Sequence, residues 1–559
     1  MKRSLLCSIL CLYCLSQTSA QTPFTTRDSV FINKINASVL LHGDMWWDPV
    51  SQLPKCEFPK YTGKNIGFVS SLWMSGYDAG GQLHVSSQTY RQSGNDYWPG
   101  PLDASGNLNY STSANWAKFW KVRRSDIQYF QSLTTHTTSN TPASILTWPA
   151  AGNTYAAGYA GAPLTISATT TMAPFIDLNA NGIYEPLSGE YPDVKGDEAI
   201  WWAFSDNGPS HNNSNGHPLG VEIHAMSYGY GRGTLIDNVV YYEYTIVNKS
   251  GSTYNNFRLA QFSDADLGYY HDDYVGFDSA HRMSIYYNGY FDDGFSGGHP
   301  AVSYGIHCPV QGVTMIELPG DAGTTYVPAG NFVSYNNDFS VIGNPSNDTG
   351  YDNYIRGKNR NGILFTNDWV GPGLPTLPTG TGPVMRYFYP GDPSDSSQYS
   401  ECAAGNNPGD RRTVLSTNDF TLAPGASAKI VMALVVTDTN QGGCPNVSFH
   451  DINTVADTAW NVYHNPPPPL PAAIGNINAG GQLSVHPNPA GNYLYVDIAG
   501  AMSTRATITI YNALGQLQEA PVTDNAQGKV INISALPPAV YFMHYCNDAT
   551  QRVIKFVKQ

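Results

Sequence analysis

The feature that most constrains the fold is a repeated pattern of short apolar runs closed by turn residues, which is clearest in residues 483–559. Apolar and polar residues alternate in residues 493–498, 506–512, 530–533, 540–544 and 553–558. Gly, Pro or Asn separates these runs. Alternation of this kind is typical of strands with one buried face. We therefore predict a small antiparallel β-sandwich at the C-terminal end.

The same stretch carries an ordered set of short motifs, from Val485-His486-Pro487-Asn488-Pro489 through Tyr511-Asn512 to the apolar run near Tyr541. Their order resembles the type A C-terminal sorting domain of proteins exported by the type IX secretion system of Bacteroidota. The resemblance implies a secreted or cell-surface protein. Its implied partners are the outer-membrane translocon and a sortase-like peptidase that removes the domain. The sorting signal would comprise Pro487, Asn488, Pro489, Tyr511, Asn512, Gly515, Leu536 and Tyr541.

The N-terminus has the features of a signal peptide, which we assign to residues 1–20. Lys2 and Arg3 precede an apolar stretch over residues 5–15, and small residues stand at Thr18 and Ala20. This arrangement predicts removal of the leader before Gln21. The apolar stretch is too short to span a membrane comfortably, so we expect no transmembrane segment in the mature chain.

Charge and composition narrow the classes of partner. Removal of Lys2 and Arg3 with the leader leaves 27 of the 29 basic residues against 43 acidic ones, a net charge of -16. An acidic chain disfavours nucleic acid and anionic membranes and is compatible with divalent cations. Aromatic residues make up 12% of the chain and charged residues 13%, with 54 Gly and 38 Pro. This composition favours a turn-rich extracellular β protein over a disordered chain.

The chain is long enough for several domains, and we expect a mainly β protein: a large, decorated β-sandwich body with long loops and few helices, followed by the small C-terminal sandwich. Residues 21–165 form an aromatic-rich β region with one helix predicted at 113–133, interrupted near 123–126. Residues 166–464 form the sandwich body, with a strand at 238–248, a hairpin at 419–436, insertions over 265–412 and a helix at 449–463. The run of prolines at 466–469 marks a stiff linker, assigned to 465–482, before the sorting domain at 483–559.

The body also resembles a known group of proteins. Residues 71–101, 173–202 and 264–278, together with Gly409-Asp410-Arg411-Arg412, are similar to those of a family of large exported Bacteroidota proteins of undefined activity. The resemblance implies an exported surface protein. It supplies no catalytic residue.

Residues 177–185 form the first of two acidic loops that are candidates for calcium binding. Asp177, Asn179 and Asn181 supply side-chain oxygens at alternate positions, Gly182 follows, and Ile183 offers its carbonyl. This order suits the first half of an EF-hand-like loop. The loop ends at Glu185, and Ser188 stands where a bidentate Glu is expected, so Glu190, Asp193 or Asp197 would have to complete the shell. The alternative is a metal-free Asx-turn loop.

The second acidic loop concentrates five carboxylates between residues 264 and 278. They belong to Asp264, Asp266, Asp272, Asp273 and Asp278, and no Lys or Arg occurs between Arg258 and Arg282. Carboxylates held close without counter-charge repel one another, and a bound cation removes that cost. We therefore predict calcium here as the cofactor. The alternative is a splayed, solvated loop.

Catalytic motifs are weak. Residues 294–298 fit G-x-S-x-G but lack the preceding buried strand and following helix of a nucleophile elbow. A carboxylate pair for glycoside hydrolysis cannot be selected from so many acids. Trp46-Trp47 and Trp201-Trp202 are candidates for stacking on sugars, although we expect most of these side chains in the core.

The leading hypothesis for the body is a calcium-stabilised, non-enzymatic module that binds a surface glycan, a protein or a solid surface. The alternatives are a secreted hydrolase acting on polysaccharide and a structural component of a surface or motility apparatus.

Five cysteines remain after the leader is removed: Cys56, Cys308, Cys402, Cys444 and Cys546. Cys402 and Cys444 flank one apolar strand pattern, and we predict a disulfide between them. The alternative is a set of reduced, buried thiols.

Overall fold

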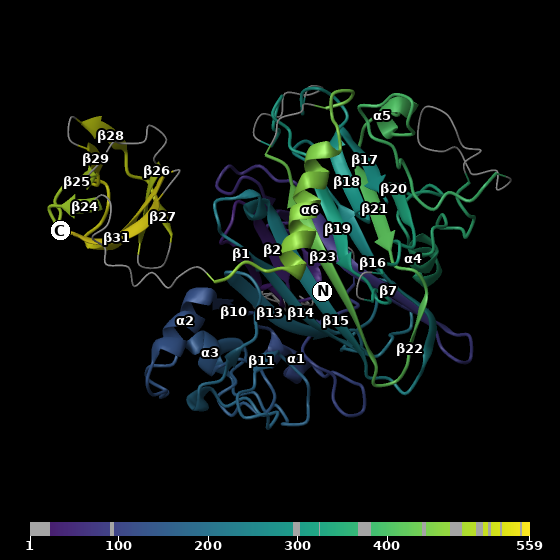
Figure 1. Cartoon of the computed structure of the whole chain (residues 1–559), viewed down its shortest axis with the longest axis horizontal. Coiled ribbons are helices and arrows are strands. Elements are labelled where there is room, and N and C mark those ends of the chain that lie inside the picture. Colours follow the sequence, from purple (N-terminus) through teal and green to yellow (C-terminus); the bar gives the residue numbers. More distant parts are fainter. Residues whose placement is uncertain are drawn as a thin grey trace, which may run out of the picture. The chain divides into compact units, whose positions relative to one another are not determined.

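The computed structural model describes residues 23–89, 94–294, 302–322, 325–366, 382–438, 443–469, 483–498, 507–512, 516–525, 528–547 and 550–559. The chain divides into two compact units, Met1–Pro469 and Leu470–Gln559 (Figure 1). The division falls inside the linker predicted at 465–482. The predicted signal peptide lies outside the described residues, as do most of the linker and Gly515.

Two antiparallel sheets build the first unit. The first contains, in order, β1 (Arg27–Val30), β2 (Asn36–Leu40), β3 (Asp44–Met45), β7 (Val69–Tyr77), β16 (Tyr254–Asp264), β21 (Arg411–Ser416) and β20 (Phe332–Asn336). Three further strands pair with β2, β7 and β16 respectively: β6 (Cys56–Glu57), β8 (Leu83–Ser86) and β22 (Phe420–Leu422).

The second sheet contains, in order, β10 (Trp120–Arg123), β13 (Glu198–Ser205), β14 (Val221–Gly229), β15 (Val239–Asn248), β23 (Ser427–Val436), β19 (Gln311–Glu317), β18 (Met283–Asn288) and β17 (Asp273–Asp278). β9 (Trp98–Pro99) pairs with β13. Two small ribbons join β4 (Trp47–Asp48) to β5 (Leu53–Pro54) and β11 (Phe175–Ile176) to β12 (Tyr191–Pro192).

β15 shows how the sandwich is packed. Tyr242 and Tyr244 enter a core shared by residues of both sheets. Val239 and Tyr241 enter a second core on the other face, which we call the outer core. Trp46 Nε1 donates a hydrogen bond across the shared core to the Tyr242 hydroxyl, at 2.9 Å. Successive side chains of a strand point to opposite faces, so a strand covered on both faces carries apolar residues on both, as the first four residues of β15 do. The strand predicted at 238–248 is confirmed.

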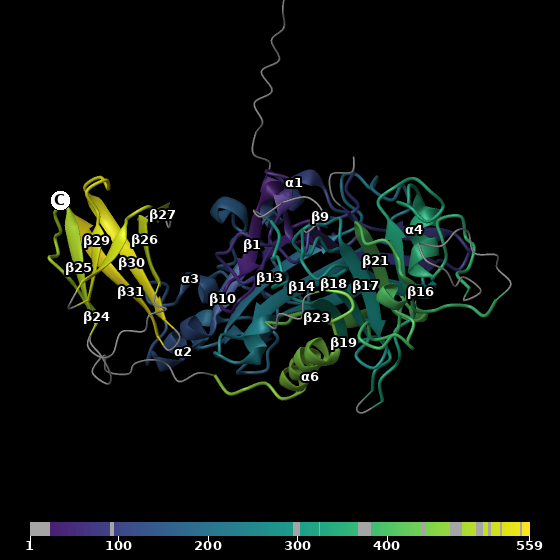
Figure 2. The same cartoon turned by 90° about the horizontal axis from the view of Figure 1, so that it is seen from above.

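Helices cover the outer face of the second sheet. α6 (His450–His464) lies along β23 and β19, as two perpendicular views show (Figures 1 and 2). The Tyr241 hydroxyl donates to the Ala459 carbonyl at 2.8 Å. The helix predicted at 449–463 is therefore confirmed. The remaining short helices are α1 (Tyr110–Trp116), α2 (Arg124–Ser132), α3 (Ala143–Leu146), α4 (Asp348–Ile355) and α5 (Glu401–Ala404), with 3-10 turns at Pro23–Thr25, Tyr159–Gly161, Pro186–Ser188 and Leu235–Asn238.

The helix predicted at 113–133 is wrong in its middle. β10 separates α1 from α2 and extends the second sheet, with Trp120 opposite Trp201. Trp120 and Val122 are both buried in the outer core. Their alternation is that of a strand, and pairing with β13 overrides the helix-like spacing of the surrounding apolar residues.

Residues 21–165 and 166–464, which the sequence assigned to separate regions, contribute strands to the same sheets. Strands from residues 21–165 and 166–464 pair directly, as β7 does with β16. Residues 265–412, predicted as decoration, supply β17 to β20 and the first two residues of β21, and are integral to both sheets. These strands are short and almost wholly buried, so they lack the alternation that identifies a half-exposed strand.

The second unit consists of two four-stranded antiparallel sheets. One contains β24 (Leu483–His486), β25 (Tyr493–Ile498), β29 (Gly528–Asn532) and β28 (Val522–Asn525) in order. The other contains β27 (Leu517–Gln518), β26 (Thr507–Asn512), β30 (Ala539–Asn547) and β31 (Thr550–Lys558). Leu494 and Ile531 of the first sheet share a core with Met543 and Phe556 of the second. The predicted C-terminal sandwich is confirmed.

Among the described residues, no helix is both long and apolar enough to cross a membrane.

Candidate metal centre and cleft

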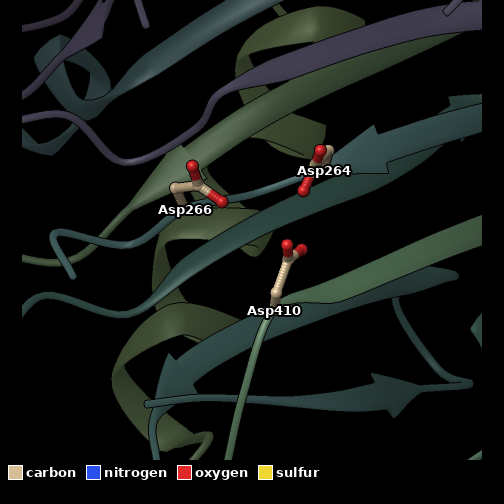
Figure 3. Close-up of side chains that lie close together, drawn as sticks. All are labelled: Asp264, Asp266 and Asp410. Atoms are coloured by element: carbon tan, nitrogen blue, oxygen red, sulfur yellow. The ribbon is translucent and has the colours of Figure 1, made fainter. Parts of the chain in front are cut away.

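Three aspartates converge where β16 ends and β21 begins. Asp264 is the last residue of β16, Asp266 follows two residues later, and Asp410 directly precedes β21. One oxygen of each lies within 4.8 Å of the others, and the three carboxyl groups point toward a common space (Figure 3). β16 and β21 are paired, with Asp264 opposite Arg412. Strand pairing therefore brings Asp410 to the loop predicted as a calcium site.

One arginine partly balances these charges. Arg412 donates to Asp264 Oδ2 from Nε at 3.1 Å and lies 3.0 Å from it through Nη2, and both side chains are almost fully buried. Arg412 also donates to Asn337 Oδ1 at 2.8 Å, and Asn337 Nδ2 donates to Asp410 Oδ2 at 3.0 Å. Arg412 is the arginine that pairs with Asp264 among the described residues, and carboxylates gathered this closely attract cations.

The three carboxylates line a cleft of about 680 Å³. Its other walls include Tyr269, Tyr270 and His271, and the Tyr270 side chain is 41% exposed. The cleft therefore combines a cluster of oxygen ligands with aromatic rings that a bound molecule can contact.

Asp272, Asp273 and Asp293 form a buried acidic group beside this loop. Asp272 accepts from Gly294 N at 2.8 Å, Asp273 from Leu267 N at 3.1 Å, and Asp293 from Tyr269 N at 2.9 Å. Burial raises the pKa of Asp272 to about 7 and that of Asp293 to about 6, and it raises the pKa of Asp273 well above its ordinary value. The carboxylates of Asp272 and Asp266 raise the pKa of Asp273 further. Within the described residues, the second oxygen of both Asp272 and Asp273 is buried without a hydrogen-bond partner.

Asp278 lies apart from this group. It ends β17 at the opposite end from Asp273, and its carboxylate is 3.0 Å from His281 Nδ1. His281 Nε2 lies 3.2 Å from Asp457 of α6. The second predicted loop therefore divides: Asp264 and Asp266 join Asp410, Asp272 and Asp273 stay close by, and Asp278 pairs with a histidine.

His281 should make stability depend on pH. Its hydrogen bond to Asp278 outweighs burial and raises its pKa, so the folded state holds the proton more tightly than the unfolded state. The stabilisation is complete below the ordinary histidine pKa and is lost as pH rises through the raised value. We expect His281→Asn to reduce the free energy of unfolding at about pH 6 and to have little effect at about pH 9. Urea unfolding of both proteins at the two pH values measures this, and an equal loss at both would contradict it.

The first predicted loop closes on itself. Gly182 N donates to Asp177 at 2.8 Å, and the amide groups of Asn179 and Asn181 donate to Glu185 at 2.9 and 2.8 Å. Ile183 N donates to Asn181 Oδ1 at 2.7 Å. Asp193 is exposed, Glu190 accepts from the Leu178 and Glu185 amides, and Asp197 pairs with Arg232. In the described part of the chain, no three acidic side chains of this loop converge as Asp264, Asp266 and Asp410 do.

The tryptophans proposed for sugar stacking are buried. Trp46 and Trp202 enter the core shared by both sheets, and Trp201 enters the outer core. Trp47 is only 7% exposed. Trp201 and Trp202 face opposite sides of β13, and the body covers both sides, whereas Trp46 lies between β3 and β4 and shares one core with Trp47. Residues 295–298 of the G-x-S-x-G match lie outside the described residues.

Cys402 of α5 and Cys444 form a disulfide with a Cα–Cα distance of 5.8 Å, the pair expected from the sequence. It ties α5 to the segment that leads into α6. Cys56 and Cys308 are buried free thiols, and the side chain of Cys546 lies outside the described residues.

Asp410 was missed by the sequence analysis because its distance in the chain from Asp264 hides the pairing of β16 with β21. The sequence feature that could have identified Asp410 is local: it is a carboxylate directly before the buried strand that begins with Arg411-Arg412. An acid and two arginines at the start of a buried strand indicate charges that need partners.

The predicted sorting residues make hydrogen bonds and core contacts within the second unit. Asn488 accepts from Val557 N at 2.9 Å and donates to the Lys555 carbonyl at 3.2 Å. The Tyr541 hydroxyl donates to the Pro537 carbonyl at 2.9 Å. Asn512 accepts from Gln516 N at 2.9 Å, and Leu536 is buried. These contacts hold the strand ends and turns of the sandwich.

Comparisons with known proteins inform the second unit and not the body. No curated protein matches the chain. A solved polysaccharide lyase shares 8% identity over 60% of this chain, with a TM-score of 0.18, a value that carries no argument about the body. The chain spans about a third, 34%, of that lyase.

Residues 484–559 match the family described as the secretion system C-terminal sorting domain. They coincide with the second unit, so the sorting signal is a separate folded sandwich. The chain is therefore a secreted or cell-surface protein, delivered by a C-terminal sorting domain of the type IX secretion system.

Proposed function

We propose that the body is a calcium-stabilised, non-enzymatic binding module that acts outside the cell, with its ligand cleft at Asp264, Asp266 and Asp410. The observation that carries the proposal is the convergence of these carboxylates within 4.8 Å on the wall of a cleft of about 680 Å³. A surface glycan or a protein is the ligand that this position supports.

Calcium is the cation that best suits these groups. It takes six to eight oxygen ligands in flexible geometry, and carboxylates, amide oxygens and water supply them. Asn337, which lines the cleft, already bonds Asp410. One oxygen of Asp272 and one of Asp273 are buried without a hydrogen-bond partner among the described residues, and a cation nearby would stabilise both. We propose the site at Asp264, Asp266 and Asp410, with Asp272 and Asp273 supporting its potential.

The arrangement favours binding over hydrolysis. A glycosidase places its acid and base on either side of the scissile bond. Here the carboxylates converge on one point, and Arg412 pairs with Asp264. An exposed tryptophan beside the acids would favour the hydrolase, and none lines the cleft among the residues that the structure describes.

Calcium titration of the body by calorimetry tests the site. We expect one tight site, and we expect Asp266→Asn and Asp410→Asn each to weaken calcium binding at least roughly tenfold, because each removes a charged ligand. Asp103→Asn is the matched control. It makes the same change of charge in an exposed turn, where the Asp103 carboxylate accepts the backbone amides of Ser105 and Asn107. Equal affinity in all four proteins would refute the site.

The pH dependence gives an independent test. Without metal, the raised pKa values of Asp272 (about 7) and Asp293 (about 6) mean that the folded state binds protons that the unfolded state releases. Stability in EDTA should therefore fall as pH rises from about 4 to 7, whereas calcium bound at Asp264, Asp266 and Asp410 should reduce this fall because its positive charge favours the ionised forms of the nearby Asp272 and Asp293. Thermal unfolding across this range, with EDTA or calcium, measures it. A fall that calcium leaves unchanged would contradict the account.

A glycan array, read with calcium and with EDTA, tests the ligand. Calcium-dependent capture that Tyr270→Ala abolishes would support the cleft as the binding surface, since Tyr270 lines it and is exposed. Turnover of a polysaccharide by the wild-type body would instead favour the hydrolase.

A further inference from the structure

A pocket of about 300 Å³ lies at the start of β1, beside the segment that joins α1 to β10 and the turn formed by residues 158–161. β1 and β10 lie near each other in both views (Figures 1 and 2). Arg27 and Asp28 of β1, Lys118 of the joining segment and Tyr159 of the turn line the pocket. The calcium proposal uses none of these residues, so the pocket is an independent feature of the body.

The turn is fixed by its own contacts. A Cβ on Gly158 would lie 2.0 Å from the Asn115 carbonyl oxygen of α1, so only glycine allows the turn to pack this closely. Gly158 N donates to the Ala162 carbonyl at 2.8 Å, which closes the turn. The Ala157 carbonyl accepts from Lys118 Nζ at 2.7 Å. The walls of the pocket are therefore held by the protein itself, which lowers the entropic cost of binding.

The Lys118 ammonium has no counter-charge among the described residues. Its hydrogen bond goes to a neutral carbonyl, and it lies 5.2 Å from the centroid of the Trp120 ring. The side chain is half-buried, and burial lowers its pKa, with no carboxylate of the described residues opposing that shift. A partly buried cation without a counter-ion is unfavourable, and a bound anion removes that cost.

The other charged residues of the pocket are already paired. Asp28 Oδ1 lies 2.6 Å from Lys121 Nζ, so this carboxylate does not neutralise Lys118. Arg27 forms a longer ion pair, at 3.5 Å, with Asp48, and its side chain is 40% exposed. An arginine has five N–H donors, so Arg27 retains donors for a second partner. The pocket therefore carries an excess of positive charge in a chain that is acidic as a whole.

We propose that this pocket binds the carboxylate or sulfate group of an acidic sugar, held by the Lys118 ammonium and the Arg27 guanidinium. Hydrogen bonds between such cations and an oxyanion are charge-assisted and stronger than neutral ones. Tyr159 lines the same pocket and is 41% exposed, so its ring is available to contact the sugar that carries the anion.

Calorimetric titration of the full chain with D-glucuronate and with D-glucose tests the proposal. The two sugars differ at one carbon, where glucuronate has a carboxylate and glucose a hydroxymethyl group. We expect glucuronate to bind roughly tenfold or more tightly, and its affinity to fall as NaCl rises from about 50 to 500 mM. Equal affinity for the two sugars, or binding of neither, would overturn the proposal. EDTA is present throughout, so failure here leaves the calcium proposal standing.

Three substitutions locate the binding. Lys118→Met keeps the alkyl stem and should weaken glucuronate binding roughly tenfold, and Arg27→Gln should weaken it several-fold. Lys358→Met is the matched control, because it makes the same change of charge just after α4, which lies across the body from β10 (Figures 1 and 2). Melting temperatures establish that the variants fold. Unchanged affinity in Lys118→Met would refute the site, as would an equal loss in Lys358→Met.

Acetate distinguishes an acidic sugar from a small free anion. Tighter binding of glucuronate than of acetate, with Tyr159→Ala removing the difference, would support the sugar. Equal affinity for the two anions would overturn the assignment of a sugar and leave a site for a free carboxylate.

Discussion

A chain that ends after Pro469 should remain inside the cell envelope, with export reduced to background. The sorting domain occupies residues 484–559, and the two units divide between Pro469 and Leu470. The second unit has its own core, built from its own two sheets. The truncated body therefore keeps every strand of its sandwich, and immunoblots of the medium, the cell surface and the periplasm measure where it accumulates.

The control is the stability of the truncated body. Because its cores lie within the first unit, its melting temperature should match the main transition of the full chain. Normal export of the truncated chain would contradict the assignment of the tail. A truncated body that failed to fold would contradict the separation into two units.

Replacement of Glu401 by Gln should destabilise the body by about 3–5 kcal/mol, because it leaves a buried arginine without its counter-charge. Arg411 Nη2 lies 2.9 Å from Glu401, and the two side chains are 5% and 0% exposed. Glu401 also accepts from Val275 N at 3.0 Å and from Asn406 at 3.0 Å. Urea unfolding of the body at neutral pH measures the loss.

Two further variants make this test specific. Asp419→Asn alters a more exposed ion pair, in which the Asp419 side chain is 42% exposed, and should cost about 1 kcal/mol or less. The double variant Glu401→Met with Arg411→Met removes both charges and should recover much of the stability. A loss below that of Asp419→Asn would show that the pair contributes little.

The sequence predicted those elements whose apolar residues recur at the regular spacing of a strand or a helix. β15 and α6 are long, and their apolar patterns match a strand covered on both faces and an amphipathic helix. The C-terminal sandwich was predicted because each strand keeps one exposed face, as in β25, where Leu494 and Val496 are buried and Tyr493 and Tyr495 are exposed.

Elements defined by pairing were not predictable. β10 has four residues and depends on β13 for its extended form. β20 and β21 pair with each other although they lie far apart in the chain. For strands this short, the sheet supplies the stability that local preference does not, and one sequence does not reveal which strands pair.

The candidate site follows the same rule. Asp264 and Asp266 are neighbours in the chain, and their acidic loop marked them. Asp410 reaches them through the pairing of β16 with β21, and Asp278 leaves them because β17 carries it to the far end of a strand. Calcium at this site remains the proposal on which the account of the body depends.

Anomalous diffraction from crystals of the body grown with calcium tests that proposal most directly. The account predicts a calcium peak among Asp264, Asp266 and Asp410, with oxygens at about 2.3–2.6 Å. A map with no peak there at millimolar calcium, and with Asp264 still paired to Arg412, would contradict it.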